Sequence, residues 1–468
     1  MNKLQQCLLG YLAMSFVAIV NAQQAAPPPG PPRPFQLPTP VTVSLPNGIE
    51  ATFVDFGVVP KVTIAIAVRT GNLNEGNQTW LADLSGDLLK EGTRDRTAEQ
   101  IADAATLMGG QVGIGVSADE TTLYLDTLSE YGSDAVALLA EILTQPRLPE
   151  SELPRIRQDY LRNLSVQMTQ PQAIASAAMS ELLYPDHPYG TAYPTPEQLN
   201  SYTIADVRNY YESNFGARRT RIYVAGKFDR AAVEKSIRDN LGEWRAGPDV
   251  LSLPPPQGQP QTVKLIDRPG APQSTLRIGK RVIDVTQPDF MALSVANSLL
   301  GGVLTSRITM NLRETKGWAY SPNSVLATNY HQASWLENAD VKAESTGPSI
   351  TEIFKEIETL RAAPPTQTEL MAIKNYRNGI FVMGTATRGG LIGQLAMMNL
   401  QGLPPDWLTT FAQRMYAVTP EQITQAARDH LDPSRMSVVV VGDLATVRPQ
   451  IEAVAPLRNA IATATATP

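Results

Sequence analysis

The chain has 468 residues, 43% of them hydrophobic and 18% charged, and a formal net charge of −6. This length exceeds what one ordinary hydrophobic core organises, so it predicts two or more domains. The negative balance and the absence of a long basic run argue against nucleic-acid binding, which requires a basic patch or stripe.

The N-terminal segment predicts export. Lys3 precedes an apolar run from Cys7 to Val20, and small residues follow at positions suited to cleavage after Ala22. A transmembrane anchor is the alternative, but the run is short and no positive cluster follows it. We therefore expect residues 1–22 to be a signal peptide, with the mature protein in the periplasm of a Gram-negative bacterium and not stably inserted in a membrane.

The cysteine content limits the chemistry of the mature chain. Cys7 is the only cysteine and lies within the expected signal peptide. The mature chain would then be without disulfides, thiol nucleophiles and cysteine metal ligands.

Proline-rich segments divide the remaining chain. Residues 23–40 predict an extended lead-in, and residues 246–261 predict a linker. We expect an N-terminal domain at 41–245, a C-terminal domain at 262–450 and a low-complexity tail at 451–468.

The first half predicts strands and helices in mixed order. Strands are expected at 41–44, 49–54 and 62–68, and the turn 46-PNG-48 predicts an antiparallel hairpin. Helices are expected at 80–90, 97–108, 132–144, 151–168, 172–183 and 204–213. The expected class is α+β, with two duplicated α/β-sandwich domains that carry helices over one face of each sheet.

The ends of the two halves indicate the duplication. In each, a threonine N-cap opens an amphipathic helix, and a turn, a β-branched strand and a glycine follow. The spacing from Thr203 to Gly226 equals that from Thr419 to Gly442. Equal order and spacing predict an internal repeat.

Standard hydrolase motifs are missing. The chain has no G-x-S-x-G elbow, no P-loop and no dinucleotide fingerprint. Its three histidines, His187, His331 and His430, are not within helical reach of one another, so each is interpreted as a packing or surface residue; His430 ends an expected helix, where a cation is favourable.

The helix near residue 80 has an unusual composition. Asp83 and Asp87 lie one turn apart with Gly86 between them. Like charges at this spacing and an interior glycine both disfavour a helix, by a few tenths to about 1 kcal/mol. Another constraint must set this pattern.

Several stretches resemble a known family, in order along nearly the whole mature chain. They are 45-LPNGI-49, 71-GNLNEGNQTWLADLSGDLLKEGT-93, 108-MGGQVGIGVSADETTLYL-125, 184-YPDHPYG-190, 268-RPGAPQSTLRIG-279, 299-LLGGVLTSRI-308 and 312-LRETKGWAYS-321. They are similar to the insulinase/pitrilysin-type metallopeptidases, the inverzincins with an H-x-x-E-H helix. Within that family, the chain resembles the short, two-domain bacterial and mitochondrial-processing type.

The resemblance implies that the metal site is replaced. The two zinc-binding histidines fall on Asp83 and Asp87, the general base on Gly86, and the third ligand near Asn163. The asparagine that binds substrate backbone falls on Gly113. Catalytic zinc needs three ligands and an open position for water. The favoured interpretation is a solvated polar face left from a lost site; a rebuilt carboxylate metal site is the alternative.

Other family positions are retained. Arg313 and Tyr320 match the Arg/Tyr pair that holds the substrate carbonyl in the family, and both side chains suit a developing oxyanion. A structural arginine beside a buried tyrosine is the alternative. Gly301 and Gly302 match a glycine-rich loop that helps to gate or bind peptide, although a tight turn after a core helix explains them equally well.

This division predicts a non-catalytic, substrate-binding subunit of an exported zinc metallopeptidase heterodimer. Zinc is expected in a homologous partner that bears H-x-x-E-H, and none in this chain, which would supply Arg313 and Tyr320 in trans to a bound peptide. Two alternatives remain: an inert structural or peptide-binding scaffold, and a peptidase-like enzyme with a rebuilt carboxylate metal site.

Overall fold

The computed structural model describes residues 37–256, 260–458 and 460. The expected signal peptide, most of the lead-in, and parts of the linker and tail lie outside these residues. No helix within the described ranges is both long and apolar enough to cross a membrane.

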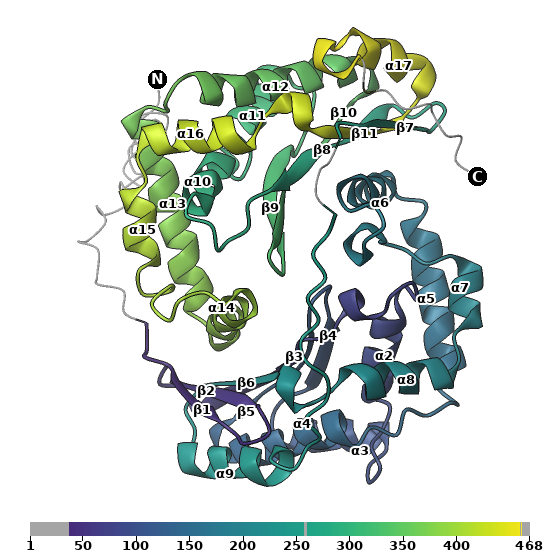
Figure 1. Cartoon of the computed structure of the whole chain (residues 1–468), viewed down its shortest axis with the longest axis vertical. Helices are drawn as coiled ribbons and strands as arrows, with labels where there is room; N and C mark the ends of the chain where they lie inside the picture. The colour runs from purple at the N-terminus through teal and green to yellow at the C-terminus, as the bar shows by residue number, and fades with distance from the viewer. Residues whose placement is uncertain (1–36, 257–259, 459, 461–468) are drawn as a thin grey trace, which may run out of the picture. The chain divides into compact units, whose positions relative to one another are not determined.

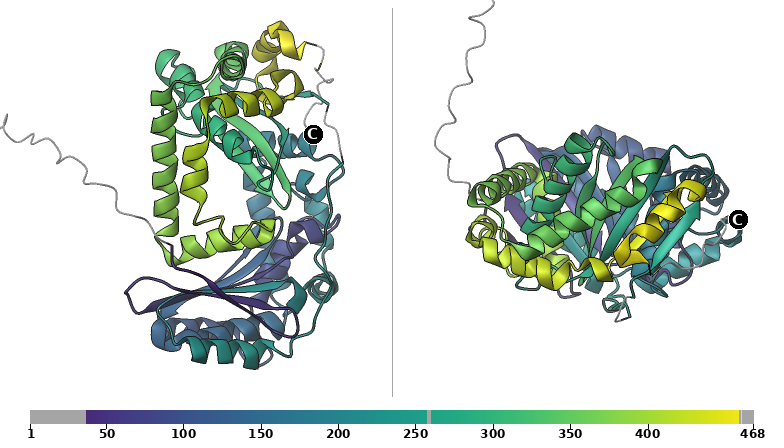
Figure 2. Two further views of the ribbon diagram at one scale, coloured as in Figure 1. Left: turned by 60° about the vertical axis from the view of Figure 1, so that its left-hand side comes forward. Right: turned by 90° about the horizontal axis from the view of Figure 1, so that it is seen from above.

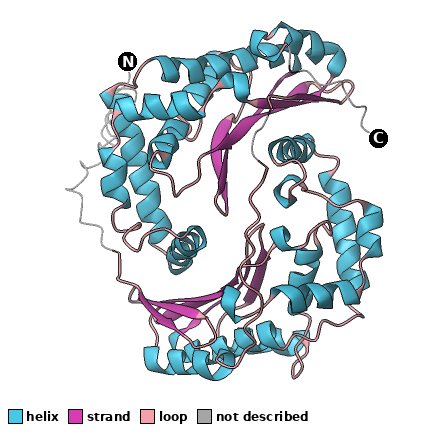
Figure 3. Ribbon diagram, in the orientation of Figure 1, coloured by secondary structure: helices cyan, strands magenta, loops and turns pink. Residues whose placement is uncertain are grey.

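From residue 37 on, the described part of the first half forms a six-stranded sheet with eight α-helices (Figures 1 and 3). Its strands are β1 (Val41–Ser44), β2 (Glu50–Asp55), β3 (Lys61–Val68), β4 (Val112–Val116), β5 (Thr121–Leu128) and β6 (Thr220–Gly226). Its helices are α2 (Leu81–Leu89), α3 (Ala98–Leu107), α4 (Gly132–Thr144), α5 (Leu153–Gln167), α6 (Pro171–Leu183), α7 (Pro196–Ser201), α8 (Ile204–Asn214) and α9 (Arg230–Leu241).

The second half forms a five-stranded sheet with its own helices. Its strands are β7 (Val263–Asp267), β8 (Gln273–Val282), β9 (Asn323–Asn329), β10 (Gln332–Lys342) and β11 (Ser437–Gly442). Its helices are α10 (Phe290–Leu300), α11 (Arg307–Thr309) with the π-helix Met310–Thr315, α12 (Thr346–Ala362), α13 (Gln367–Thr385), α14 (Arg388–Gln401), α15 (Phe411–Ala417), α16 (Pro420–His430) and α17 (Leu444–Ala453).

The C-terminal boundary differs from the expected one. The predicted start of the tail at 451 falls inside α17, and Ile451, Val454 and Leu457 are buried in the core of the second sheet. The low-complexity sequence that suggested a tail begins only after these apolar residues.

The sheet topology shows the duplication directly. The strand orders are β1-β2-β6-β3-β5-β4 and β7-β11-β8-β10-β9, so the second sheet repeats the first without its β1 edge. In each, the last strand pairs parallel with the first strand of the shared pattern and antiparallel with the next. The mixed sheets with helices confirm the predicted α+β class.

Matching caps begin the repeated segments. Thr203 and Thr419 each accept a hydrogen bond from the backbone N–H three residues on, at the start of α8 and α16. The side chains of Asp206 and Gln422 return a bond to the cap residue, which completes a capping box in both halves. Local sequence therefore sets the start of both helices.

Each sheet is also covered on its second face by a helix from the other half. Figure 2 gives two further views of the sheets and their covering helices. On the first sheet, α14 packs its apolar side on β3 and β6; the residues of this cluster include Val54, Ala65, Ala67, Tyr223, Ala225, Leu391, Ile392, Leu395 and Met398. On the second, α6 packs on β11; this cluster includes Ala175, Ala178, Met179, Leu183, Ile266, Val439 and Val441. The sequence predicts helices over one face only, because these contacts join residues distant in the chain.

Polar contacts join the halves at the α14 position. Arg388, at the start of α14, donates from Nη2 to Asp126 Oδ1 on β5 at 2.8 Å and from Nε to Thr63 Oγ1 at 3.1 Å. Lys61 Nζ binds the other oxygen of Asp126 at 3.0 Å. Burial alone would raise the pKa of Asp126, but the hydrogen bonds from Thr63, Arg388 and Lys61 hold it below its ordinary value.

Candidate functional site

The helix α2, which carries the positions of the family's H-x-x-E-H motif, is capped by the carboxylate of Glu75, a residue that precedes the helix. Trp80 precedes α2 in a left-handed conformation with φ of 67°, and its side chain provides no cap. Instead, Glu75 accepts the backbone N–H of Trp80 at 3.0 Å and of Ala82 at 2.9 Å. Burial raises the pKa of Glu75 to about 7, although these bonds lower it. Glu75 is not among the residues predicted from the sequence, because its distance along the chain does not fit an ordinary N-cap.

Asp83 and Asp87 are partnered rather than simply solvated, which corrects the favoured sequence interpretation. Asn72 donates to Asp83 Oδ2 at 2.7 Å. Lys90 binds Asp87 Oδ1 at 2.7 Å, and the Tyr160 hydroxyl donates to Asp87 Oδ2 at 2.8 Å. Burial raises the pKa of Asp83, while the Asn72 bond opposes this shift.

The glycine between the two aspartates lies against β4. A Cβ built on Gly86 would stand 2.6 Å from Cγ2 of Val116, which is closer than carbon atoms pack. Gly113, the other glycine at a replaced family position, is covered by the Tyr124 ring, which would lie 2.1 Å from a Cβ there. Both glycines therefore admit a close neighbour where the family carries a functional side chain.

The position of the third ligand does not complete a site. Asn163 is exposed on α5, and its Oδ1 accepts a long bond of 3.5 Å from Gln167. The residue of α5 that contacts Asp87 is Tyr160, one turn earlier. Burial and the neighbouring aspartates raise the pKa of Tyr160, so its hydroxyl stays a donor.

This donor set does not fit a catalytic zinc. Both oxygens of Asp87 are hydrogen-bonded, Gly86 has no side chain, and Asn163 supplies only an amide. Within the described residues, no group of three or more His, Cys, Asp or Glu side chains is placed to hold a metal. The helix keeps its packing role through Leu81, Leu84 and Leu88, which are buried.

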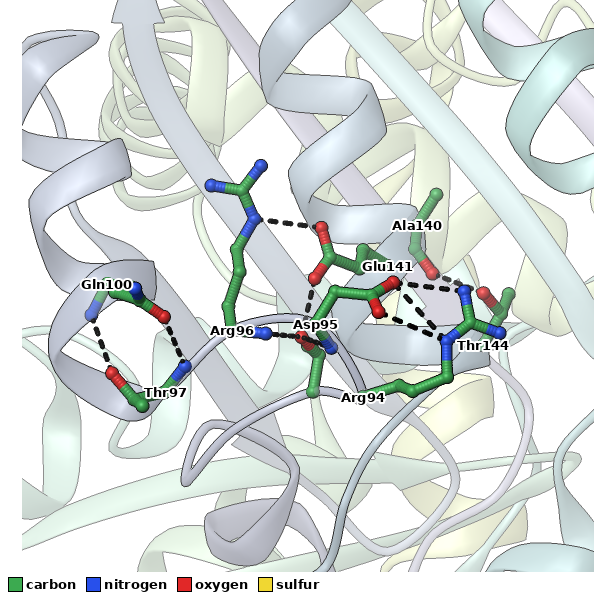
Figure 4. Close-up of polar contacts among 9 residues, drawn as sticks. Arg94, Asp95, Arg96, Thr97, Gln100, Ala140, Glu141 and Thr144 are labelled. Atoms are coloured by element: carbon green, nitrogen blue, oxygen red, sulfur yellow. Dashed lines mark hydrogen bonds and ion pairs between the residues drawn. The ribbon is translucent and has the colours of Figure 1, made fainter.

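The turn after α2 is fixed by polar contacts with α4 (Figure 4). Arg96 Nε donates to Glu141 Oε2 at 3.0 Å, and the Thr93 hydroxyl donates to the other carboxylate oxygen. Thr97 and Gln100 then form a capping box at the start of α3. These contacts hold the family's turn in place without the metal site.

The side chains of Arg313 and Tyr320 lie against each other. The Arg313 guanidinium lies 5.1 Å from the centroid of the Tyr320 ring, a cation–π distance. Arg313 lies within the π-helix Met310–Thr315, a form often found at functional sites, and its Nε pairs with Glu314 at 3.1 Å. Tyr320 is 79% exposed, which contradicts the alternative of a buried structural tyrosine.

Gly301 and Gly302 end α10 in a tight turn. A Cβ on Gly301 would lie 2.6 Å from Ser324 Oγ and 2.7 Å from Glu337 Oε2. A Cβ on Gly302 would lie 2.9 Å from Asn297 Nδ2. The close packing explains both glycines, in line with the turn alternative. Glu337 is 1% exposed, and burial raises its pKa well above its ordinary value.

The histidines have packing environments. His187 is buried; its Nδ1 accepts the Tyr189 N–H at 3.1 Å, and its Nε2 lies 2.8 Å from the Leu253 carbonyl. His430 does end α16, but burial lowers its pKa, which opposes the cationic form expected at a helix end. The His331 backbone N–H donates to Gln401 of α14 at 3.1 Å.

The sequence and the fold both match a known family of proteins. A model described as "Insulinase (Peptidase family M16)" matches residues 58–197, and one described as "Peptidase M16 inactive domain" matches residues 201–376. The crystal structure of a peptidase M16 inactive domain from Pseudomonas fluorescens has a TM-score of 0.81 and 25% identity, over 86% of this chain and 98% of that one. These matches define a peptidase-like scaffold. The chain belongs to the insulinase family of peptidases, M16.

The curated relatives include proteins described as proteases and one described as a non-peptidase homolog. A Bacillus subtilis protein described as an uncharacterized zinc protease, YmxG, is 24% identical over 82% of this chain and 93% of its own length. A Helicobacter pylori protein described as a non-peptidase homolog, YmxG, is 20% identical over 82% of this chain and 90% of its own length.

Proposed function

We propose that this chain is the non-catalytic, substrate-binding subunit of an exported zinc metallopeptidase. A homologous subunit with an intact H-x-x-E-H helix would hold the zinc, and this chain would bind none. Arg313 and Tyr320 would act in trans, placing a guanidinium and a phenol beside the carbonyl oxygen of a peptide at the partner's zinc.

The observation that carries the proposal is the contrast between two positions. The Arg313 and Tyr320 side chains are in contact, and the phenol is exposed and free to meet a substrate. At the frame of the metal site, Asp83 and Asp87 are engaged by Asn72, Lys90 and Tyr160. A chain with donors for an oxyanion but no zinc ligands is incomplete as a peptidase and suits a composite site.

The test is reconstitution with an H-x-x-E-H-bearing homologue from the same genome. The chain is purified alone, the partner alone, and the two together, without chelators, and each sample is assayed for zinc and for cleavage of a peptide library. We expect zinc in the partner and the pair but not in this chain, and strong cleavage only by the pair.

Tyr320→Phe provides a sharp variant, because it keeps the ring beside Arg313 and removes only the hydroxyl. Tyr376→Phe on α13 is the matched control, since Tyr376 is also exposed. Cleavage or stoichiometric zinc in the lone chain would overturn the proposal and favour a rebuilt carboxylate site. Failure of the two subunits to associate would favour the inert scaffold.

A further inference from the structure

A cavity of about 430 Å³ in the second half is lined by residues of the edge strand β9 and of α10, α13 and α14. Figure 1 labels these four elements. Much of its wall is apolar, including Phe290, Val325, Leu326 and Met397. Among the described residues of this wall, Arg377 is the only one with a charge. A small cavity with a few polar groups in an apolar wall is the usual form of a ligand site.

Arg377 has spare hydrogen-bonding capacity. Its Nη1 donates to the Ser294 carbonyl at 3.1 Å and to Ser298 Oγ at 2.8 Å. Its Nε is buried with no partner, and no carboxylate in the described residues pairs with it. A guanidinium has five N–H donors, so only part of this group is satisfied. Burial lowers its pKa, the cost of a buried cation without an anion.

Arg307 shows how a guanidinium group pairs with a carboxylate elsewhere in this half. Arg307 binds both oxygens of Glu369, at the start of α13, at 2.7 and 2.8 Å. This is the two-bond arrangement that guanidinium and carboxylate geometry favours. Arg377, on the same helix as Glu369, has no such partner from the chain. A carboxylate from a ligand would supply it.

A second polar atom in the cavity wall, an acceptor, has no hydrogen-bond donor. Asn297, also in the cavity wall, has a buried Oδ1 without a hydrogen bond, while its Nδ2 donates to the Ser324 carbonyl at 3.4 Å. A buried acceptor left unpaired is costly, so an N–H from a ligand would be stabilising there. The cavity thus combines a cation for a carboxylate, an acceptor for an N–H and apolar walls.

We propose that this cavity binds the C-terminal residue of a peptide that ends in an apolar amino acid. The free carboxylate would pair with Arg377, the amide N–H with Asn297, and the side chain would lie against Phe290, Leu326 and Met397. This goes beyond the proposed function: it requires neither Arg313 and Tyr320 nor a catalytic partner, and holds equally for a scaffold.

The test is calorimetric titration of the purified full chain at neutral pH. The probes are N-acetyl-Ala-Ala-Leu with a free carboxylate, the same tripeptide as its C-terminal amide, N-acetyl-leucine and octanoate. We expect the free acid to bind and the amide to bind about tenfold more weakly or worse, because a charge-assisted pair is lost. Octanoate, which has no N–H, should bind more weakly than the tripeptide acid.

Two variants locate the binding. Arg377→Gln should weaken the free acid about tenfold or more and leave the weak amide unchanged. Because Arg377 also ties α13 to α10, Val325→Glu gives a second arm: Val325 is 40% exposed on β9, so a carboxylate there repels the ligand without cutting into the core. Arg435→Gln, at an exposed position, is the control for net charge and should bind like the unchanged protein.

Any one of five results would overturn the assignment. Equal binding of acid and amide would remove the role of the carboxylate. Unchanged affinity in both Arg377→Gln and Val325→Glu would place the ligand elsewhere. No binding of the acid up to about 10 mM would show that the cavity is not a site for a peptide C-terminus. Octanoate binding as tightly as the tripeptide would assign the cavity to simple organic acids, whereas N-acetyl-leucine matching the tripeptide would assign it to free acylated amino acids.

Discussion

Gly86 gives a test of why the metal-site frame holds a glycine. Replacing an interior helical glycine with alanine ordinarily stabilises a helix by about 1 kcal/mol. Here the new Cβ would stand 2.6 Å from Val116 Cγ2. Overpacking a tight site costs about 1–3 kcal/mol, so Gly86→Ala should be net destabilising by about 1 kcal/mol.

A double-mutant cycle isolates this contact. Val116→Ala removes the methyl group in the way, so Gly86→Ala made in that background should stabilise the protein by about 1 kcal/mol. Gly379→Ala on α13 is the matched control, because a Cβ there would meet no atom within 4 Å. This control should also be stabilising by a similar amount.

The assay is urea unfolding of the four proteins of the cycle and the control, with the midpoint and slope compared between them. Trp80 lies beside Tyr160 and Tyr193 at the start of α2, and its fluorescence reports on this region. If Gly86→Ala stabilises the otherwise unchanged protein as much as Gly379→Ala does, and shows no coupling to Val116, the packing explanation is refuted.

Two further predictions concern pH. Because the pKa of Glu75 is raised to about 7 in the folded chain, its contribution to the free energy of unfolding is complete below its ordinary pKa near 4.5 and is lost as the pH rises through 7. Glu75→Gln should therefore flatten the pH dependence of the urea midpoint in this window. The same pH dependence in the variant and the unchanged protein would contradict the raised pKa. The pKa of Asp126 is lowered, so its contribution is present above the ordinary carboxyl value and is lost as the pH falls through the folded pKa. Arg388→Met should therefore move the acid-unfolding midpoint of the chain to higher pH, and an identical midpoint would show that the contact between α14 and β5 does not stabilise the fold.

Local sequence predicted the repeated framework well. The threonine caps, the equal spacing from Thr203 to Gly226 and from Thr419 to Gly442, and the β-branched strands are all short-range signals. They specify α8–β6 and α16–β11, whereas the parallel pairing of β6 with β2 and of β11 with β7 was not predicted from the sequence. The family frame likewise follows from contiguous motifs.

The side chains that surround the positions of the metal-site motif could not be predicted from the sequence. The capping of α2 by Glu75, the engagement of Asp87 by Tyr160 and the approach of Val116 to Gly86 join residues brought together only by folding. Nothing in the α2 sequence announces these partners. The same holds for α6 and α14, whose apolar sides cover the sheet of the opposite half.

The central claim is that Arg313 and Tyr320 serve an active site whose zinc belongs to another subunit. Its most direct test is kcat/KM for peptide cleavage by the reconstituted pair, with Arg313→Ala, Tyr320→Phe or Tyr376→Phe in this chain. Loss of an oxyanion donor ordinarily lowers kcat by about 100- to 1000-fold. We predict losses of that size for Arg313→Ala and Tyr320→Phe, mainly in kcat, and none for Tyr376→Phe; unchanged kcat/KM for the first two would contradict the account.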